Sequence, residues 1–67
     1  MKLKDLAPVL DTSERSPRLV VVHDKKWGRD IIVNCTAYHA LEWFGDMELV
    51  SLGARDHRLV LNVRDIH

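Results

Sequence analysis

Histidine and cysteine are the residue types in this sequence best suited to metal binding or nucleophilic chemistry. The histidines are His23, His39, His57 and His67, and the single cysteine is Cys35. Metal sites use three or four such ligands, often in C-x2-C or H-x3-H pairs, and neither spacing occurs here. We expect Cys35 in a strand and His39 in the helix that follows it. The sequence therefore predicts no metal site and no cofactor.

A catalytic site is not indicated either. A nucleophilic Cys35 would need a neighbouring base and a lowered pKa, and we interpret it as a small apolar residue packed at a strand end. The carboxylates fall in predicted turns or at strand ends, where they favour turn formation and solvation. The chain has three glycines, and it contains no glycine-rich phosphate loop and no nucleophile elbow. We therefore predict that the protein is not an enzyme.

Aromatic residues give a clearer functional signal. Trp27 lies in a predicted polar turn, and Tyr38 and Trp43 lie off the apolar stripe of a predicted helix. Tryptophan, tyrosine and arginine are enriched among the residues that dominate binding energy at protein interfaces. We therefore predict a protein-binding surface. Its residues are Trp27, Tyr38, Trp43, Val60 and Arg64. An alternative for Trp27 is that its ring covers the open face of the sheet, and one for Trp43 is an edge or dimer contact.

Basic residues flank both predicted hairpin turns. If the two turns lie at the same end of the sheet, they form a local positive end despite the zero net charge. One aromatic ring among these cations could stack on a base, so a nucleotide or single-stranded nucleic acid is the alternative ligand. The residues of this alternative site are Lys25, Lys26, Trp27, Arg29, Arg55 and Arg58. The simpler interpretation is solvated charge that is partly balanced by Asp24, Asp30 and Asp56.

The elements that must position these residues follow from hydrophobic periodicity. Strands are predicted over 18–24, 30–35, 48–52 and 58–64. Helices are predicted over 3–10, with Pro8 near the first turn, and over 37–44, between an N-cap at Thr36 and a C-terminal Gly45. Residues 11–17 are predicted to be a solvated connector, and Gly28 is expected to take a positive φ.

The predicted order is α-β-β-α-β-β. We expect an α+β fold in which two short helices pack on one face of a four-stranded, mainly antiparallel sheet, with residues 1–67 as a single domain. In the strand over 30–35, alternation places Ile31, Val33 and Cys35 on one face and Ile32 and Asn34 on the other. Apolar residues are also expected on the face away from the helices. These are Val20, Val22, Ile32 and Val60, together with Val50 and Leu52 as further candidates.

Composition narrows the class of protein. The 67 residues are 46% hydrophobic and 30% charged, which is typical of a soluble globular domain, and ten basic residues balance ten acidic ones. This balance argues against a strongly basic nucleic-acid binder. No apolar run could span a bilayer and the first ten residues do not resemble a signal peptide, so we expect a cytoplasmic protein that does not bind membranes. Because so small a core is marginal, we also predict a homodimer.

Three segments suggest a family. The opening residues 1–6 (MKLKDL), residues 35–37 (CTA) and residues 48–52 (ELVSL), together with the hairpin between them, resemble small proteins of phages and prophages of Gram-positive bacteria. The resemblance covers nearly the whole chain. Such proteins have no settled activity, and many phage accessory proteins bind and block a host factor. The favoured expectation is a phage accessory factor that inhibits a host protein, such as an anti-defence or anti-CRISPR-like factor, and the alternatives are a nucleic-acid or nucleotide binder and a structural or assembly subunit.

Overall fold

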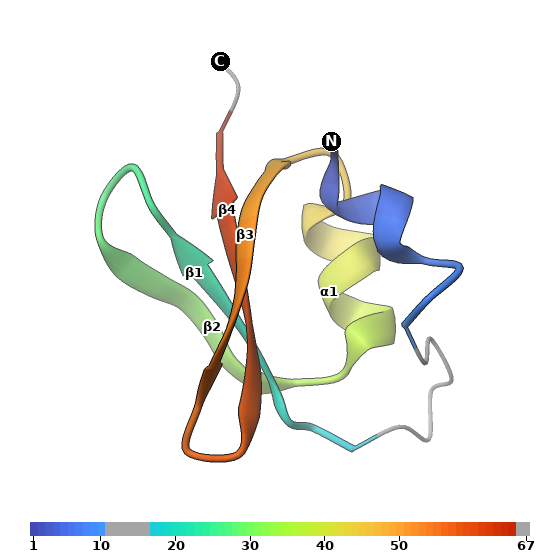
Figure 1. The fold of residues 1–67 in the computed structure, drawn as a ribbon, viewed down its shortest axis with the longest axis vertical. Coiled ribbons are helices and arrows are strands. Elements are labelled where there is room, and N and C mark those ends of the chain that lie inside the picture. Colours follow the sequence, from blue (N-terminus) through green and yellow to red (C-terminus); the bar gives the residue numbers. More distant parts are fainter. Residues whose placement is uncertain (11–16, 66–67) are drawn as a thin grey trace.

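Four strands form one sheet in the order β2-β1-β4-β3 (Figure 1). The computed structural model describes residues 1–10 and 17–65. Its elements are the 3-10 turn η1 (Leu3–Leu6), β1 (Val20–Asp24), β2 (Arg29–Cys35), α1 (Ala37–Phe44), β3 (Glu48–Arg55) and β4 (Arg58–Arg64). The predicted connector lies outside the described residues except for Pro17. No helix in the described ranges is long and apolar enough to cross a membrane.

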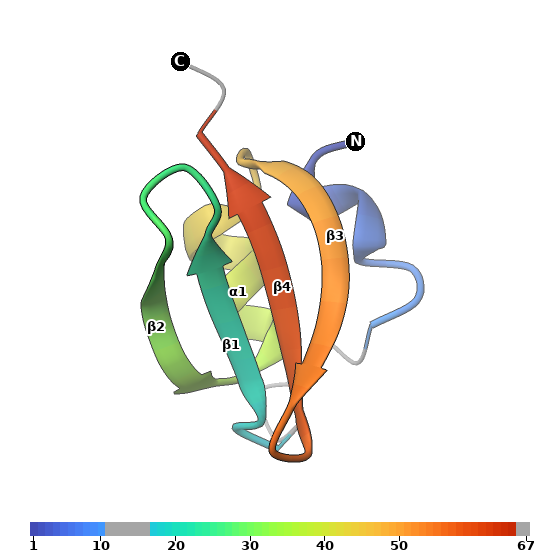
Figure 2. The same ribbon diagram turned by 60° about the vertical axis from the view of Figure 1, so that its left-hand side comes forward.

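The sheet is mixed rather than mainly antiparallel. The pairs β1–β2 and β3–β4 are antiparallel hairpins, as predicted, but the two central strands β1 and β4 run parallel. The chain leaves β2 at one edge, passes through α1, enters β3 at the other edge and returns in the middle as β4 (Figure 2). This crossover makes the central pair parallel. The fold is therefore α+β with a four-stranded mixed sheet.

The predicted helix over residues 3–10 is wrong, because the chain forms only the short η1 turn there. The Ala7 amide donates to the Lys4 carbonyl at 3.1 Å. This hydrogen bond joins residues three apart, as in a 3-10 helix. Pro8 has no N–H with which to continue the ladder to Lys4. Two apolar residues of this segment are nevertheless buried, since Leu3 and Leu6 both lie in the core. Among the described residues, one α-helix rather than two therefore packs on the sheet.

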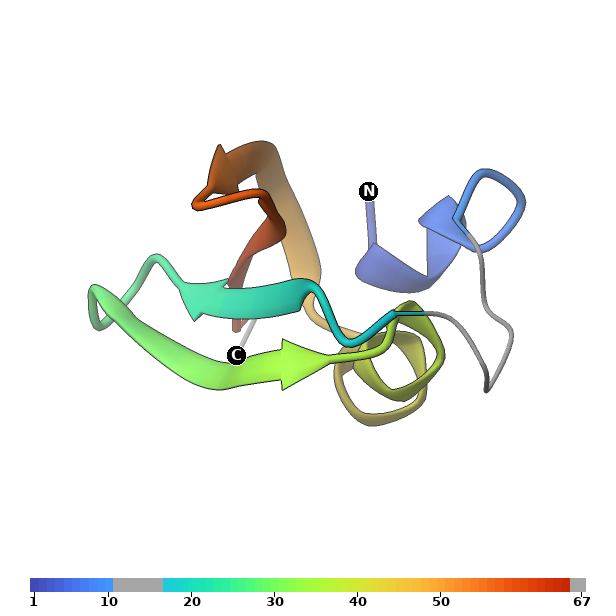
Figure 3. The ribbon, with the colours of Figure 1, turned by 90° about the horizontal axis from the view of Figure 1, so that it is seen from below.

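The second predicted helix is confirmed over Ala37–Phe44, and it begins as expected at Thr36. The His39 amide donates to the Thr36 hydroxyl at 3.1 Å, which satisfies one of the free donors of the first turn. Ala37 and Ala40 are buried on the sheet side of α1. Helix α1 and η1 lie on the same side of the sheet (Figure 3).

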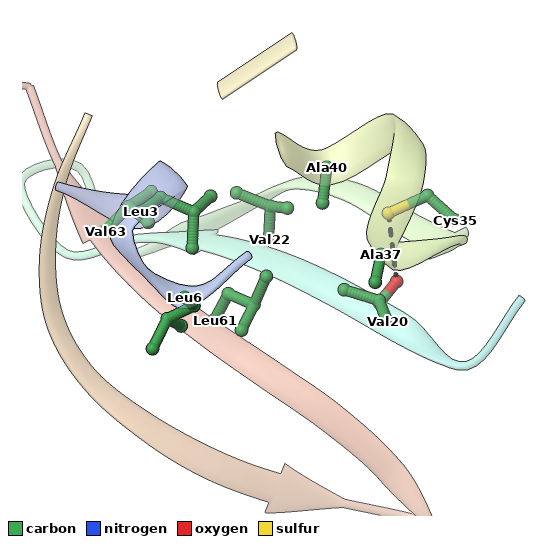
Figure 4. Packing of buried hydrophobic residues seen from close by; sticks show 9 residues of the cluster. All are labelled: Leu3, Leu6, Val20, Val22, Cys35, Ala37, Ala40, Leu61 and Val63. Carbon is green, nitrogen blue, oxygen red and sulfur yellow. Dashed lines mark hydrogen bonds between the residues drawn. The ribbon is translucent and has the colours of Figure 1, made fainter. Parts of the chain in front are cut away.

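The core lies between the sheet and these two elements. The fully enclosed residues come from every element except β3 (Figure 4). They are Leu3, Leu6, Val20, Val22, Cys35, Ala37, Ala40, Leu61 and Val63. Val20, Val22 and the half-buried Ile32 therefore belong to the helix side, and their prediction for the open face is wrong.

A bulge in β2 explains why the predicted alternation fails there. Val20 pairs with Cys35, whereas Val22 pairs with Ile32, so the β2 segment is one residue longer than the β1 segment opposite it. Asn34 absorbs the irregularity with a φ of 62°. Cys35 is thereby turned to the face of Ile32, where its thiol donates to the Val20 carbonyl at 3.3 Å.

Candidate functional site

The turn between β1 and β2, residues 25–28, is fixed by hydrogen bonds to two strands. The buried carboxylate of Asp24 accepts the Lys26 amide at 2.9 Å, and the Asp24 carbonyl accepts the Gly28 amide at 2.8 Å. The Lys25 amide donates to the carbonyl of Val63 on β4 at 2.9 Å. Gly28 has a φ of 68°, which confirms the prediction for this position. The turn is therefore held in one shape.

Trp27 stands at the tip of this turn and is 69% exposed. The Lys26 ammonium lies over the indole at 5.6 Å from the ring centroid, a cation–π distance. Trp27 does not cover the sheet, so that alternative for its ring is wrong. A large aromatic surface thus remains in contact with solvent on a rigid support.

The cations beside Trp27 are free of acidic partners. Lys25, Lys26 and Arg29 form no ion pair within residues 1–10 and 17–65. Asp30, the nearest carboxylate in the sequence after Asp24, is already bound by other groups. The turn therefore combines an exposed indole with basic side chains that form no ion pair among the described residues.

The second basic turn lies at the other end of the sheet. Asp56 and His57 form the β3–β4 turn with φ values of 50° and 65°, the left-handed pair that a tight two-residue hairpin requires. Because β1 and β4 are parallel, β1 ends at the Trp27 turn whereas β4 begins at the Asp56 turn (Figure 2). The single positive end on which nucleic-acid binding by both turns depended is not formed.

The side chains of Arg55 and Arg58 bind other residues of the sheet. Arg55 Nη1 lies 2.8 Å from Asp30 Oδ2, and Arg58 Nε donates to Asn34 Oδ1 at 2.6 Å. His23 Nδ1 is also 2.8 Å from Asp30 Oδ1. The Arg55 guanidinium, followed by the His23 ring, holds the pKa of the Asp30 carboxyl below its ordinary value. These contacts cross the far face, by which we mean the sheet face opposite α1 and η1.

The far face is closed by its own side chains. Val21 and Val60 lie on it at 1% and 5% exposure. Asn62 donates to the Ser51 hydroxyl at 3.2 Å, and Arg64 pairs with Glu48 at 3.0 Å. Two predicted partner-binding residues, Val60 and Arg64, are therefore buried or ion-paired within the chain.

The aromatic residues of α1 form a separate group. The rings of His39 and Trp43 stack with centroids 4.8 Å apart and planes 9° from parallel, and Tyr38 meets the His39 ring edge-on. Trp43 is 54% exposed, whereas Tyr38 is half-buried. Among the described residues, no ring contact joins this group to Trp27. The predicted binding residues thus lie in separate places rather than on one surface.

An open apolar cavity of about 300 Å³ was not predicted from the sequence. Its lining comes from both sides of the connector, from the β3–β4 turn and from the start of α1. The residues are Leu10, Pro17, Leu19, Val20, Ala37, His57 and Leu59. Since its members come from four separate parts of the sequence, only the folded chain reveals it.

Cys35 and His39 both have local partners within the fold. Burial raises the pKa of the Cys35 thiol, and His39 Nδ1 lies 3.2 Å from the Thr36 hydroxyl. No group of three or more metal-ligating side chains occurs in the described ranges, which exclude His67.

Asp24 was expected among the carboxylates that favour turn formation at strand ends and as a partial balance for the basic turns. It was not named as the residue that fixes the Trp27 turn. The signal was available, since an aspartate followed by a polar turn with glycine is a common way of fixing a turn through side-chain hydrogen bonds.

Comparison with known proteins adds no identity. No protein-family model, no curated protein and no solved structure matches this chain.

Proposed function

We propose that this chain is a non-enzymatic binding protein, and that the Trp27 turn, residues 25–28 with Arg29, contacts a protein partner. The observation that carries the proposal is the 69% exposure of Trp27 on a turn held by three hydrogen bonds. Tryptophan is the residue type most characteristic of binding hot spots. An exposed indole on a flexible loop would lose much of its binding energy to ordering, but a fixed turn avoids that cost.

One tryptophan can contribute a large share of the binding free energy of a protein complex. Truncation of a hot-spot tryptophan to alanine weakens protein complexes by at least about 2 kcal/mol, which is roughly thirtyfold in Kd. The ring of Trp27 would be buried in a pocket of the partner, while the neighbouring cations stay at the rim. Such an arrangement needs no pocket in this small chain.

The resemblance to phage accessory proteins supplies the biological setting of the proposal. In that setting the partner is a host protein in the cytoplasm, and the consequence of binding is inhibition. The support for this setting is the sequence resemblance alone.

The proposal is tested with two matched tryptophan variants. Trp27→Ala and Trp43→Ala remove the same side chain from two exposed positions, and circular dichroism checks that both remain folded. The wild type and both variants are tagged and expressed in the cells in which the protein naturally occurs. The proteins that co-purify with each are then quantified by mass spectrometry. We expect Trp27→Ala to lose a protein that both wild type and Trp43→Ala retain. Equal capture by wild type and Trp27→Ala would refute the assignment of the turn.

A further inference from the structure

Basic side chains outnumber acidic ones around the Trp27 turn. Lys25, Lys26 and Arg29 carry three positive charges without an ion pair among the described residues. The Asp24 carboxylate is buried and occupied by the Lys26 amide. Asp30 is bound by Arg55 and His23 on the far face. Residues 24–30 carry three basic and two acidic side chains. The three basic ones are exposed and form no ion pair among the described residues.

We infer that the partner presents an acidic protein segment to this turn, with carboxylates around an apolar side chain that contacts Trp27. This inference rests on the proposed function and specifies the chemistry of the partner. Complementary charge steers association and rejects basic surfaces, while the indole supplies the apolar contact. Three cations within five residues around one aromatic ring match a short acidic motif.

The same geometry argues against a nucleic acid. A phosphate backbone is bound by a run of cations, and affinity grows with the number of phosphates neutralised. The arginines that could extend the turn into such a run are engaged elsewhere, since Arg55 pairs with Asp30 and Arg64 pairs with Glu48. The Lys26 ammonium also covers one face of the indole on which a base would stack.

The test uses an acetylated eight-residue peptide, Glu-Glu-Leu-Glu-Glu-Leu-Glu-Glu, as the probe. Its controls are the peptide with every Glu replaced by Gln and a ten-residue oligothymidylate. Binding to the full chain is followed by nuclear magnetic resonance of the backbone amides and the Trp27 indole. We expect the acidic peptide to shift the signals of residues 24–29 and the Gln peptide to bind at least about tenfold more weakly.

Two charge reversals give the matched variants. Lys26→Glu is expected to raise the Kd for the acidic peptide at least about tenfold. Lys2→Glu makes the same change in net charge and is expected to leave this Kd within about twofold of the wild-type value. Raising the salt from about 50 mM to about 300 mM should weaken binding to the wild-type chain. No shift at residues 24–29, equal binding of the Gln peptide, or tighter binding of the oligothymidylate would each overturn the inference.

Failure of the inference is distinguishable from failure of the proposed function. If cellular capture is lost in Trp27→Ala but unchanged in Lys26→Glu, the turn binds a protein through the indole and the acidic-segment inference is wrong. If Trp27→Ala captures as the wild type does, the proposed function fails and the inference fails with it.

Discussion

Arg55 and Asp30 form an ion pair of 2.8 Å between the two edge strands of the sheet, β3 and β2. Two strands separate these edges in the sheet order, so the contact requires the sheet to curl over its far face. The second contact of this kind, between Arg58 and Asn34, joins β4 to β2 at 2.6 Å. Together they close the face that the sequence suggested would be bare.

Acid should weaken this closure. The pKa values of Asp30 and Asp46 lie below the ordinary 3.8, mainly because of hydrogen bonds from Arg55 and Lys4 respectively. A carboxyl whose pKa is lower in the folded state stabilises the fold fully above its unfolded pKa, and that stability is lost as the pH falls through the folded pKa. We expect the midpoint of urea unfolding to be constant near neutral pH and to fall below about pH 4.

Two matched variants show which carboxylate causes the loss of stability in acid. Asp30→Asn removes the carboxylate that joins three strands, whereas Asp46→Asn removes one that pairs with Lys4 at the surface. Because surface ion pairs contribute little, we expect Asp30→Asn to lower the melting temperature more and to flatten the pH dependence more. Equal behaviour of the two variants would show that the ion pair across the far face does not stabilise the curled sheet.

Val60 should behave as a core residue and not as a contact for a partner. Val60→Ala is expected to lower the free energy of unfolding by about 1–3 kcal/mol, because it leaves a void beneath the polar side chains of the far face. Val50→Ala is the control, since Val50 on β3 is 49% exposed, and its effect should stay within about 0.5 kcal/mol. Chemical denaturation of both variants decides the matter, and a similar small loss in both would place Val60 at the surface.

Cys35 should be unreactive while the chain is folded. Its thiol is buried beside the Val20 carbonyl, and burial raises its pKa, so little thiolate is present at neutral pH. We expect iodoacetamide to modify Cys35 roughly a hundredfold more slowly in buffer than in denaturant, because modification requires opening of the β1–β2 region. Mass spectrometry over time measures both rates. Rapid modification in buffer would contradict the packed position of the thiol.

The predicted homodimer is not needed to cover the far face, because that face is closed by its own side chains. The exposed apolar residues that remain on strands are Ile31 and Val33 on β2 and Val50 and Leu52 on β3. Within the described ranges, the outer edge of β3 is paired at its start, where Lys2 bridges Glu48. If a second copy covers β3, light scattering after size exclusion will show a dimer that Leu52→Lys separates and Val33→Lys does not. A monomeric wild-type chain would end this prediction.

Local sequence patterns predicted the elements well where the chain itself sets the conformation. The strand over 58–64 and the helix over 37–44 have the predicted bounds, because alternation and a Thr36 cap act within a few residues. The other three strands were found with shifted ends, and β3 runs on to Arg55. The exposed turn with Trp27 and its cations was also visible in the sequence, because it depends on five consecutive residues.

Tertiary structure decided what depends on residues far apart in the chain. Only the parallel pairing of β1 with β4 placed the two basic turns at opposite ends, and no local pattern specifies which strands become neighbours. The bulge at Asn34 moved Cys35 to the core face, because packing in the folded sheet outweighs strict alternation. The Arg55–Asp30 pair joins residues 25 positions apart, so it exists only once the sheet has curled. The sequence by itself thus determined the four strands, the helix over 37–44 and the exposed turn, whereas long-range pairing decided which charges remain free to bind.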